Sequence, residues 1–225
     1  MKCRPCRREQ SPTRGTLLGE TNITPTDWLT LAWELSVRPG GVSTTHAARL
    51  LGLSFDSTWR LVHKLRRAMR AADVPALPLR GPVEADEVFL GGSRPGSPGR
   101  GAYGKQKLLV VAERAPRRGK LFMRHIPSAS ARVLVPAVSA WVRGLGVPAH
   151  FVLPVVHSVA AQFKRTWLGT WGGGVNLSQL DWYLAEFCFR HNRRHFKHRS
   201  RAFYDLVVAA LGQPYRTGAS ITRGR

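Results

Sequence analysis

The segment 83–92, VEADEVFLGG, constrains the fold most, because its pattern predicts a strand with a charged face. Glu84, Asp86 and Glu87 are three of the chain's 13 acidic residues and lie within four positions. Side chains alternate along a strand, so Glu84 and Asp86 share one face, where one or both can point at a metal ion. The alternative is an exposed edge strand whose carboxylates only balance nearby cations.

The residues that follow predict a sheet covered by helices. Two further strands, which should pair with 83–90 as a meander, are expected at 106–112 and 120–126, and a last short strand at 147–152. Apolar residues at helical spacing predict helices at 130–142, 156–168, 178–191 and 201–211. The expected fold class is therefore α/β (α+β), with a mixed sheet and flanking helices in a domain over 83–211, and a basic tail at 212–225.

The preceding part of the chain predicts a small helical domain over 23–72, joined to the sheet by a proline-rich linker at 71–82. Helices are expected at 26–37, 43–51 and 55–70, and Gly52 permits the tight turn of a helix-turn-helix.

The last of these helices has two expected faces. Its inward stripe consists of Phe55, Trp59, Val62, Leu65 and Met69. Its cations, which point elsewhere, are Arg60, Lys64, Arg67 and Arg70. We expect these cations to contact a phosphate backbone, and the alternative is a solvated helix face.

The composition favours a polyanionic partner. Thirty-five Lys and Arg against 13 Asp and Glu give a formal net charge of +22, and neutralising phosphates releases counterions. No stretch approaches the roughly 20 apolar residues of a membrane-spanning helix, so nucleic acid is favoured over a membrane. The start MKCRPCRREQ lacks the apolar core of a signal peptide, which predicts a cytoplasmic, nucleoid-associated protein.

The cysteines allow two interpretations of residues 1–22. Cys3 and Cys6 have the C-x-x-C spacing that supplies half of a tetrahedral zinc site. The residues that could complete the site are distant in the sequence, because the third cysteine is Cys188 and the nearest histidine is His46. The alternative is a disordered basic tail, and no disulfide framework is expected from three cysteines.

A second segment with candidate chemistry is 156–174, VHSVAAQFKRTWLGTWGGG. His157 and Lys164 are seven residues apart, close to two helical turns, so both lie on one face of the predicted helix. A histidine can bind a metal ion and a lysine can hold a phosphate, although two polar residues on one helical face are commonplace.

Four segments together resemble bacterial insertion-sequence transposases of the DDE superfamily, in the branch with an N-terminal zinc ribbon. They are 41–69, VEADEVFLGG at 83–92, LPVVHSVAAQFKRTWLGTWGGGVN at 153–176 and LDWYLAEFCFRHNRR at 180–194. The resemblance covers nearly the whole chain and implies an RNase H-like fold that binds double-stranded DNA at the element ends, with a homo-oligomer on DNA as one form of assembly.

The resemblance also implies roles for individual residues. Asp86 matches the first catalytic aspartate, His157 the third catalytic position, which is Glu, Asn or His in this branch, and Lys164 the accompanying lysine. In such enzymes two Mg²⁺ (or Mn²⁺) ions bridge the scissile phosphate. Arg193 and Arg194 would belong to a basic exit for DNA, and Cys3 and Cys6 would be the last two ligands of a zinc ribbon.

The chain departs from this family at the second catalytic aspartate. The segment 147–154 reads VPAHFVLP, in which His150 is the only polar side chain, and no Asp occurs between Asp86 and Asp181. An imidazole does not replace a bridging carboxylate, because Mg²⁺ prefers hard oxygen ligands. A segment near 147–154 is therefore expected to be deleted and catalysis to be impaired.

These observations leave three functional interpretations. The leading one is a DNA transposase of an insertion sequence whose strand cleavage and strand transfer are impaired. The first alternative is a non-catalytic DNA-binding protein or repressor derived from a transposase. A basic RNA-binding protein would explain the charge but not the acidic residues of 83–90.

Overall fold

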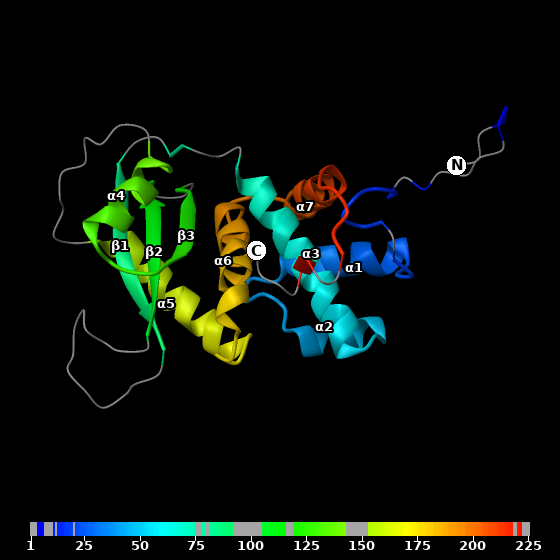
Figure 1. The fold of residues 1–225 in the computed structure, drawn as a ribbon, viewed down its shortest axis with the longest axis horizontal. Helices are drawn as coiled ribbons and strands as arrows, with labels where there is room; N and C mark the ends of the chain where they lie inside the picture. The colour runs from blue at the N-terminus through cyan, green and yellow to red at the C-terminus, as the bar shows by residue number, and fades with distance from the viewer. Residues whose placement is uncertain are drawn as a thin grey trace. The chain divides into compact units, whose positions relative to one another are not determined.

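The computed structural model describes residues 4–6, 11, 13–19, 21–74, 78–79, 82–91, 105–115, 119–142, 153–217 and 220–221. The chain forms two compact units (Figure 1), one of residues 1–72 and 196–225 and the other of residues 73–195. The strand expected at 147–152, with His150, lies outside the described residues, as does Cys3. None of the helices in the described part of the chain is long and apolar enough to cross a membrane.

The first unit is built from helices α1 (Pro25–Val37), α2 (Thr44–Leu51), α3 (Phe55–Asp73, except its last residue) and α7 (Ser200–Gly212). The Thr24 hydroxyl accepts a hydrogen bond from the Asp27 amide at the start of α1, and the Ser43 hydroxyl does the same for His46 at the start of α2. Gly52 ends α2 with a left-handed φ of 64°, which lets α3 begin three residues later. The turn glycine thus has the local role expected from the sequence.

Helix α7 belongs to this helical unit, although its sequence position suggested that it would pack on the sheet. It packs against α1, where the rings of Trp33 and Phe203 meet edge to face with centroids 5.6 Å apart. The apolar positions Ala202, Leu206 and Ala210 of α7 are buried, as a helical spacing of four requires. Apolar spacing identified this helix, but it did not specify the surface that buries it.

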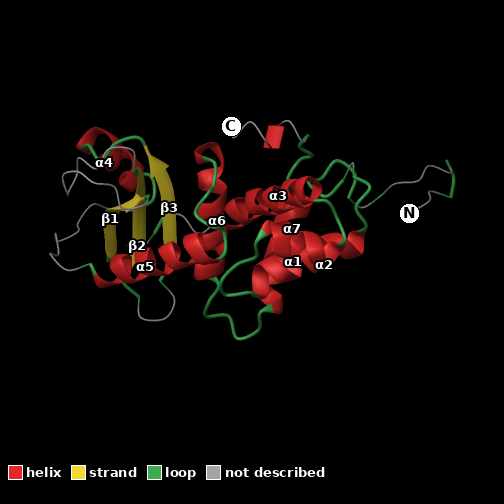
Figure 2. Ribbon diagram, turned by 90° about the horizontal axis from the view of Figure 1, so that it is seen from below, coloured by secondary structure: helices red, strands yellow, loops and turns green. Residues whose placement is uncertain are grey.

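The second unit contains an antiparallel sheet in the order β1 (Val83–Leu90), β2 (Gln106–Glu113), β3 (Leu121–Ile126). The predicted meander is confirmed. Asp86 lies opposite Val110 in the pairing of β1 with β2. The mixed α/β character expected from the sequence is also confirmed, with helices on both faces of these three strands (Figure 2).

Each face of the sheet has its own apolar layer. Helices α5 (Pro154–Gly169) and α6 (Leu180–Asn192) pack on one face against alternate strand residues such as Val88, Leu108 and Val110. Helix α4 (Ala131–Ser139) packs on the other face, against residues that include Leu109 and Val111. This alternation places Glu84 and Asp86 on the same face as Val88, which is the face covered by α5.

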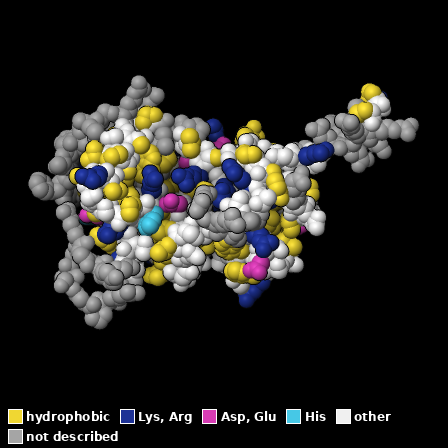
Figure 3. Space-filling view, in the orientation of Figure 1, with side chains coloured by type: hydrophobic (Ala, Val, Ile, Leu, Met, Phe, Trp, Pro, Cys, Tyr) yellow, Lys and Arg dark blue, Asp and Glu magenta, His cyan; other side chains and the backbone are white. Residues whose placement is uncertain are grey.

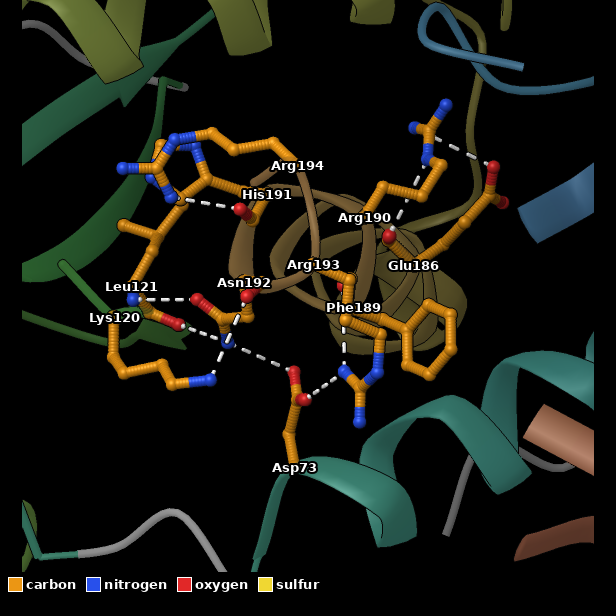
Figure 4. A network of polar contacts seen from close by, with 10 residues as sticks. All are labelled: Asp73, Lys120, Leu121, Glu186, Phe189, Arg190, His191, Asn192, Arg193 and Arg194. Carbon is orange, nitrogen blue, oxygen red and sulfur yellow. Dashed lines mark hydrogen bonds and ion pairs between the residues drawn. The ribbon is translucent and has the colours of Figure 1, made fainter. Parts of the chain in front are cut away.

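A buried polar network holds the end of α6 against strand β3 (Figure 4). The Asn192 side chain accepts a hydrogen bond from the Leu121 amide at 2.7 Å and donates to the Leu121 carbonyl at 3.1 Å. The same side-chain amide donates to Asp73 at 3.0 Å, and Arg193 forms an ion pair with that carboxylate. Because β3 is an edge strand of the described sheet, Asn192 satisfies backbone groups that have no strand partner there.

We predict that Asn192→Ala lowers the free energy of unfolding by about 3 kcal/mol, since it leaves several buried polar groups without partners. Urea denaturation followed by tryptophan fluorescence and circular dichroism measures this change. Gln162→Ala, which removes an exposed amide from α5, is the matched control and should change the value by less than about 0.5 kcal/mol. Equal stability of the two variants would show that the network does not hold the unit together.

Candidate functional site

Asp86 of β1 and His157 of α5 lie side by side. The carboxylate Oδ2 of Asp86 is 3.7 Å from Nε2 of His157, and both side chains reach solvent, with exposed fractions of 33% and 68%. The other oxygen of Asp86 accepts a hydrogen bond from the Glu87 amide at 2.8 Å. Packing of α5 on the sheet therefore brings together two residues that the sequence had assigned to one site.

Glu84 has a different environment from Asp86, although both lie on the same face of β1. Its side chain is 2% exposed, and its Oε2 accepts hydrogen bonds from the amides of Val155 at 2.9 Å and Val156 at 3.0 Å. Its Oε1 lies 3.2 Å from Nε of Arg114. Of the two acids expected to point at a metal ion, Glu84 is thus engaged by the start of α5 and by a guanidinium.

Lys164 lies further along α5 and is exposed, as is the neighbouring Arg165. The helical spacing of seven places Lys164 on the same side of α5 as His157. Helix α5 contains no Asp or Glu, so the exposed side chains of its described length are neutral or cationic. This face of the second unit is suited to an anionic ligand. Figure 3 shows Lys and Arg side chains at several places on the visible surface, with acidic side chains sparse among them.

The other two acids of the strands do not join Asp86. Glu87 is the next residue along β1, so it points to the opposite side of the strand. Glu113 at the end of β2 accepts a hydrogen bond from the Lys120 amide at 2.9 Å, which closes the turn between β2 and β3. Neither Glu87 nor Glu113 is therefore placed to share a metal ion with Asp86.

Among the described residues, the donor set around Asp86 is short of the ligands that a magnesium site needs. Two Mg²⁺ ions require several oxygen ligands, ordinarily from more than one carboxylate. Among the residues that the structure describes, no group of three or more His, Cys, Asp and Glu side chains could hold a metal ion. One carboxylate and one imidazole do not fit a two-magnesium centre.

The four cations of α3 that are expected to contact phosphates have different environments. Arg60 and Arg70 are exposed, but Lys64 is buried with its Nζ 5.6 Å from the ring centroid of Trp28 and 5.2 Å from that of Tyr215. Arg67 is half-buried and donates to the Ser220 carbonyl at 2.9 Å. The four cations do not form one solvent-facing row, because residues of the C-terminal segment cover this part of α3.

Three of the five residues of the predicted inward stripe of α3 are buried, and Trp59 is half-buried. Val62, Leu65 and Met69 are buried, whereas Phe55 is 54% exposed. Phe55 occupies the first turn of α3, before the helix reaches the packed part of the unit. Spacing alone cannot show how far along a helix the packing extends.

Arg193, which the resemblance assigned to a DNA exit, does not face solvent. It is buried, pairs with Asp73, and lies 3.9 Å from the ring centroid of Phe189 (Figure 4). Arg194 is exposed, and its guanidinium donates to the carbonyls of Gly119 and His191. Arg193 therefore has a structural role, while Arg194 remains at the surface.

Sequence reasoning missed the role of Glu84 as an acceptor for the start of α5. A signal for it was present, because Pro154 begins the helix without an amide hydrogen and the preceding Leu153 has no polar side chain to cap it. A buried helix start of this kind needs an acceptor from elsewhere in the fold. Which acid supplies it could not be read from the sequence.

Cys6 is exposed, and Cys3 lies outside the described residues. Zinc ligation by this pair therefore stays a prediction.

No known protein family, curated protein or solved structure matches the chain. The resemblance to DDE transposases accordingly rests on the sequence motifs alone.

His63 gives α3 a pH-dependent contribution to stability. Its ring is buried, and Nε2 lies 3.1 Å from the guanidinium of Arg66. Burial, followed by the charges of Arg66 and Arg67, lowers the pKa of His63 from 6.5 to about 2. The neutral ring is therefore the folded form, and its Nε2 can accept a hydrogen bond from Arg66.

We predict that stability falls as the pH is lowered from 6.5, because the unfolded chain binds a proton at His63 that the folded chain does not bind. Between pH 7 and pH 5 this residue should cost about 2 kcal/mol of unfolding free energy. Urea denaturation at both pH values should show a smaller loss for His63→Gln than for the wild type. An identical pH dependence of the two proteins would contradict the assignment.

Proposed function

We propose that this protein binds double-stranded DNA and is a transposase of the DDE type whose strand-cleavage chemistry is impaired. The observation that carries the proposal is the pairing of Asp86 with His157 beside an exposed helix face that has cations and no acids. In the family that the sequence resembles, these two positions and Lys164 act at the scissile phosphate. The formal net charge of +22 supports a polyanionic partner.

The two units supply different candidate contacts to DNA. In the helical unit, Arg60 and Arg70 are the exposed cations of α3, and α2, the turn at Gly52 and α3 have the order of a helix-turn-helix. In the sheet unit, Lys164 and Arg165 are exposed on α5. Each set would contact phosphates, which fix position and affinity without specifying sequence.

The donor set around Asp86 supports binding over cleavage. One carboxylate and one imidazole leave the described part of the site short of the oxygen ligands that a two-metal mechanism uses. The buried Glu84 is already held by hydrogen bonds to α5 and by an ion pair with Arg114. The second candidate function is an active metal-dependent transposase, which the closeness of Asp86 and His157 favours.

We predict that the protein binds duplex DNA with a strong dependence on salt. Replacing Arg60 and Arg70 by alanine, or Lys164 and Arg165 by alanine, should weaken binding. The negative slope of log affinity against log salt should also become less steep, by about one for each phosphate contact removed. Fluorescence anisotropy with labelled duplex DNA at several salt concentrations measures both quantities. Gln162→Ala, which changes another exposed residue of α5 without removing charge, should leave them unchanged.

The DNA-binding proposal has a clear contrary result. If no pair of substitutions alters the salt dependence, phosphates are not bound by these cations. If single-stranded RNA binds more tightly than duplex DNA at equal salt, the basic RNA-binding alternative replaces the proposal.

We predict binding without strand cleavage when Mg²⁺ or Mn²⁺ is added to the protein on duplex DNA that carries the flanking element ends. Gel analysis of end-labelled DNA checks this for the wild type and for Asp86→Ala. Cleavage by the wild type that is lost in Asp86→Ala and kept in Asp56→Ala, which removes an exposed acid of α3, would establish the active-transposase alternative.

A further inference from the structure

The first turn of α5 is held by a side chain from another element. Pro154 at the helix start has no amide hydrogen, and Leu153 before it makes no side-chain cap. The next two amides, of Val155 and Val156, both donate to one oxygen of Glu84 on β1. The amide of His157 then donates to the Leu153 carbonyl and begins the regular helical pattern. Glu84 thus does for α5 what a local capping residue does for α1 and α2.

We propose that Glu84 is a positioning residue, which fixes the start of α5 on β1 and thereby keeps His157 beside Asp86. The strand that carries Asp86 also carries the cap, two residues earlier and on the same face. The helix residue that meets Asp86 directly follows the two capped amides. A sliding or tilting of the first turn of α5 would therefore move His157 relative to Asp86.

The charge of Glu84 suits this role better than the role of a metal ligand. A carboxylate at a helix N-terminus is stabilised by the helix dipole and by charge-assisted hydrogen bonds from the first amides. Its burial is tolerated because Arg114 lies 3.2 Å from its second oxygen. One oxygen is thus held by two amide hydrogen bonds and the other lies in an ion pair without a hydrogen bond. The functional meaning of this positioning rests on the proposed function, because that proposal makes Asp86 and His157 the reacting pair.

Hydrogen exchange of individual amides, followed by NMR spectroscopy, tests the inference without DNA. In the wild type, the Val155 and Val156 amides should be protected although they have no partner within their own helix. In Glu84→Gln they should exchange about tenfold faster, the effect of losing a charged helix cap, while Phe163 and Trp167 later in α5 keep their protection. The nuclear Overhauser contact between the His157 ring and the Asp86 side chain should weaken in the same variant.

Val111→Ala is the matched control, because Val111 is buried on the opposite face of the sheet against α4. It should lower the stability of the unit without selectively exposing the amides of Val155 and Val156, and the contact between His157 and Asp86 should remain. Unchanged exchange in Glu84→Gln would overturn the inference. If that variant does not fold, rapid exchange of the two amides in the wild type would overturn it equally. DNA binding by the wild type, Glu84→Gln and Val111→Ala is measured separately, and its loss bears on the proposed function and not on the role of Glu84.

Discussion

The docking of helix α5 on the sheet is the interaction on which the candidate site depends. Buried apolar residues of α5, including Val156, Val159 and Phe163, pack against the alternate residues of β1 and β2 on the face that also carries Glu84 and Asp86. Removal of this apolar surface from water is the main favourable term, and the hydrogen bonds to Glu84 set the position of the first turn. Without this packing, Asp86 and His157 would be unrelated groups on two segments of the chain.

The basic residues of the chain divide into two kinds that a count of charges does not separate. Arg60, Arg70, Lys164 and Arg165 are exposed. Lys64 and Arg193 are buried against aromatic rings, and Arg193 neutralises Asp73. Long cationic side chains can stabilise a fold through their stems and through cation–π contacts. A high net charge therefore overstates the surface that is open to DNA.

The acidic residues divide in a similar way. Three acids crowd β1, yet one caps a helix, one meets His157, and one points to the other side of the strand. Glu113 is used in the turn between β2 and β3. This distribution explains why an acid-rich strand does not assemble, among the described residues, the several carboxylates that two magnesium ions require.

The sequence by itself determined the local elements and the faces of the strands. Period-two and helical apolar spacing identified all three described strands and α1 to α7 to within a few residues at their ends, and strand alternation placed Glu84 and Asp86 on one face. Tertiary structure alone decided which side chains are buried, which acid caps α5, and that α7 joins the helical unit. The reason is physical: periodicity reports the face of an element that must be buried, whereas the partner that buries it is chosen by packing between segments far apart in the chain.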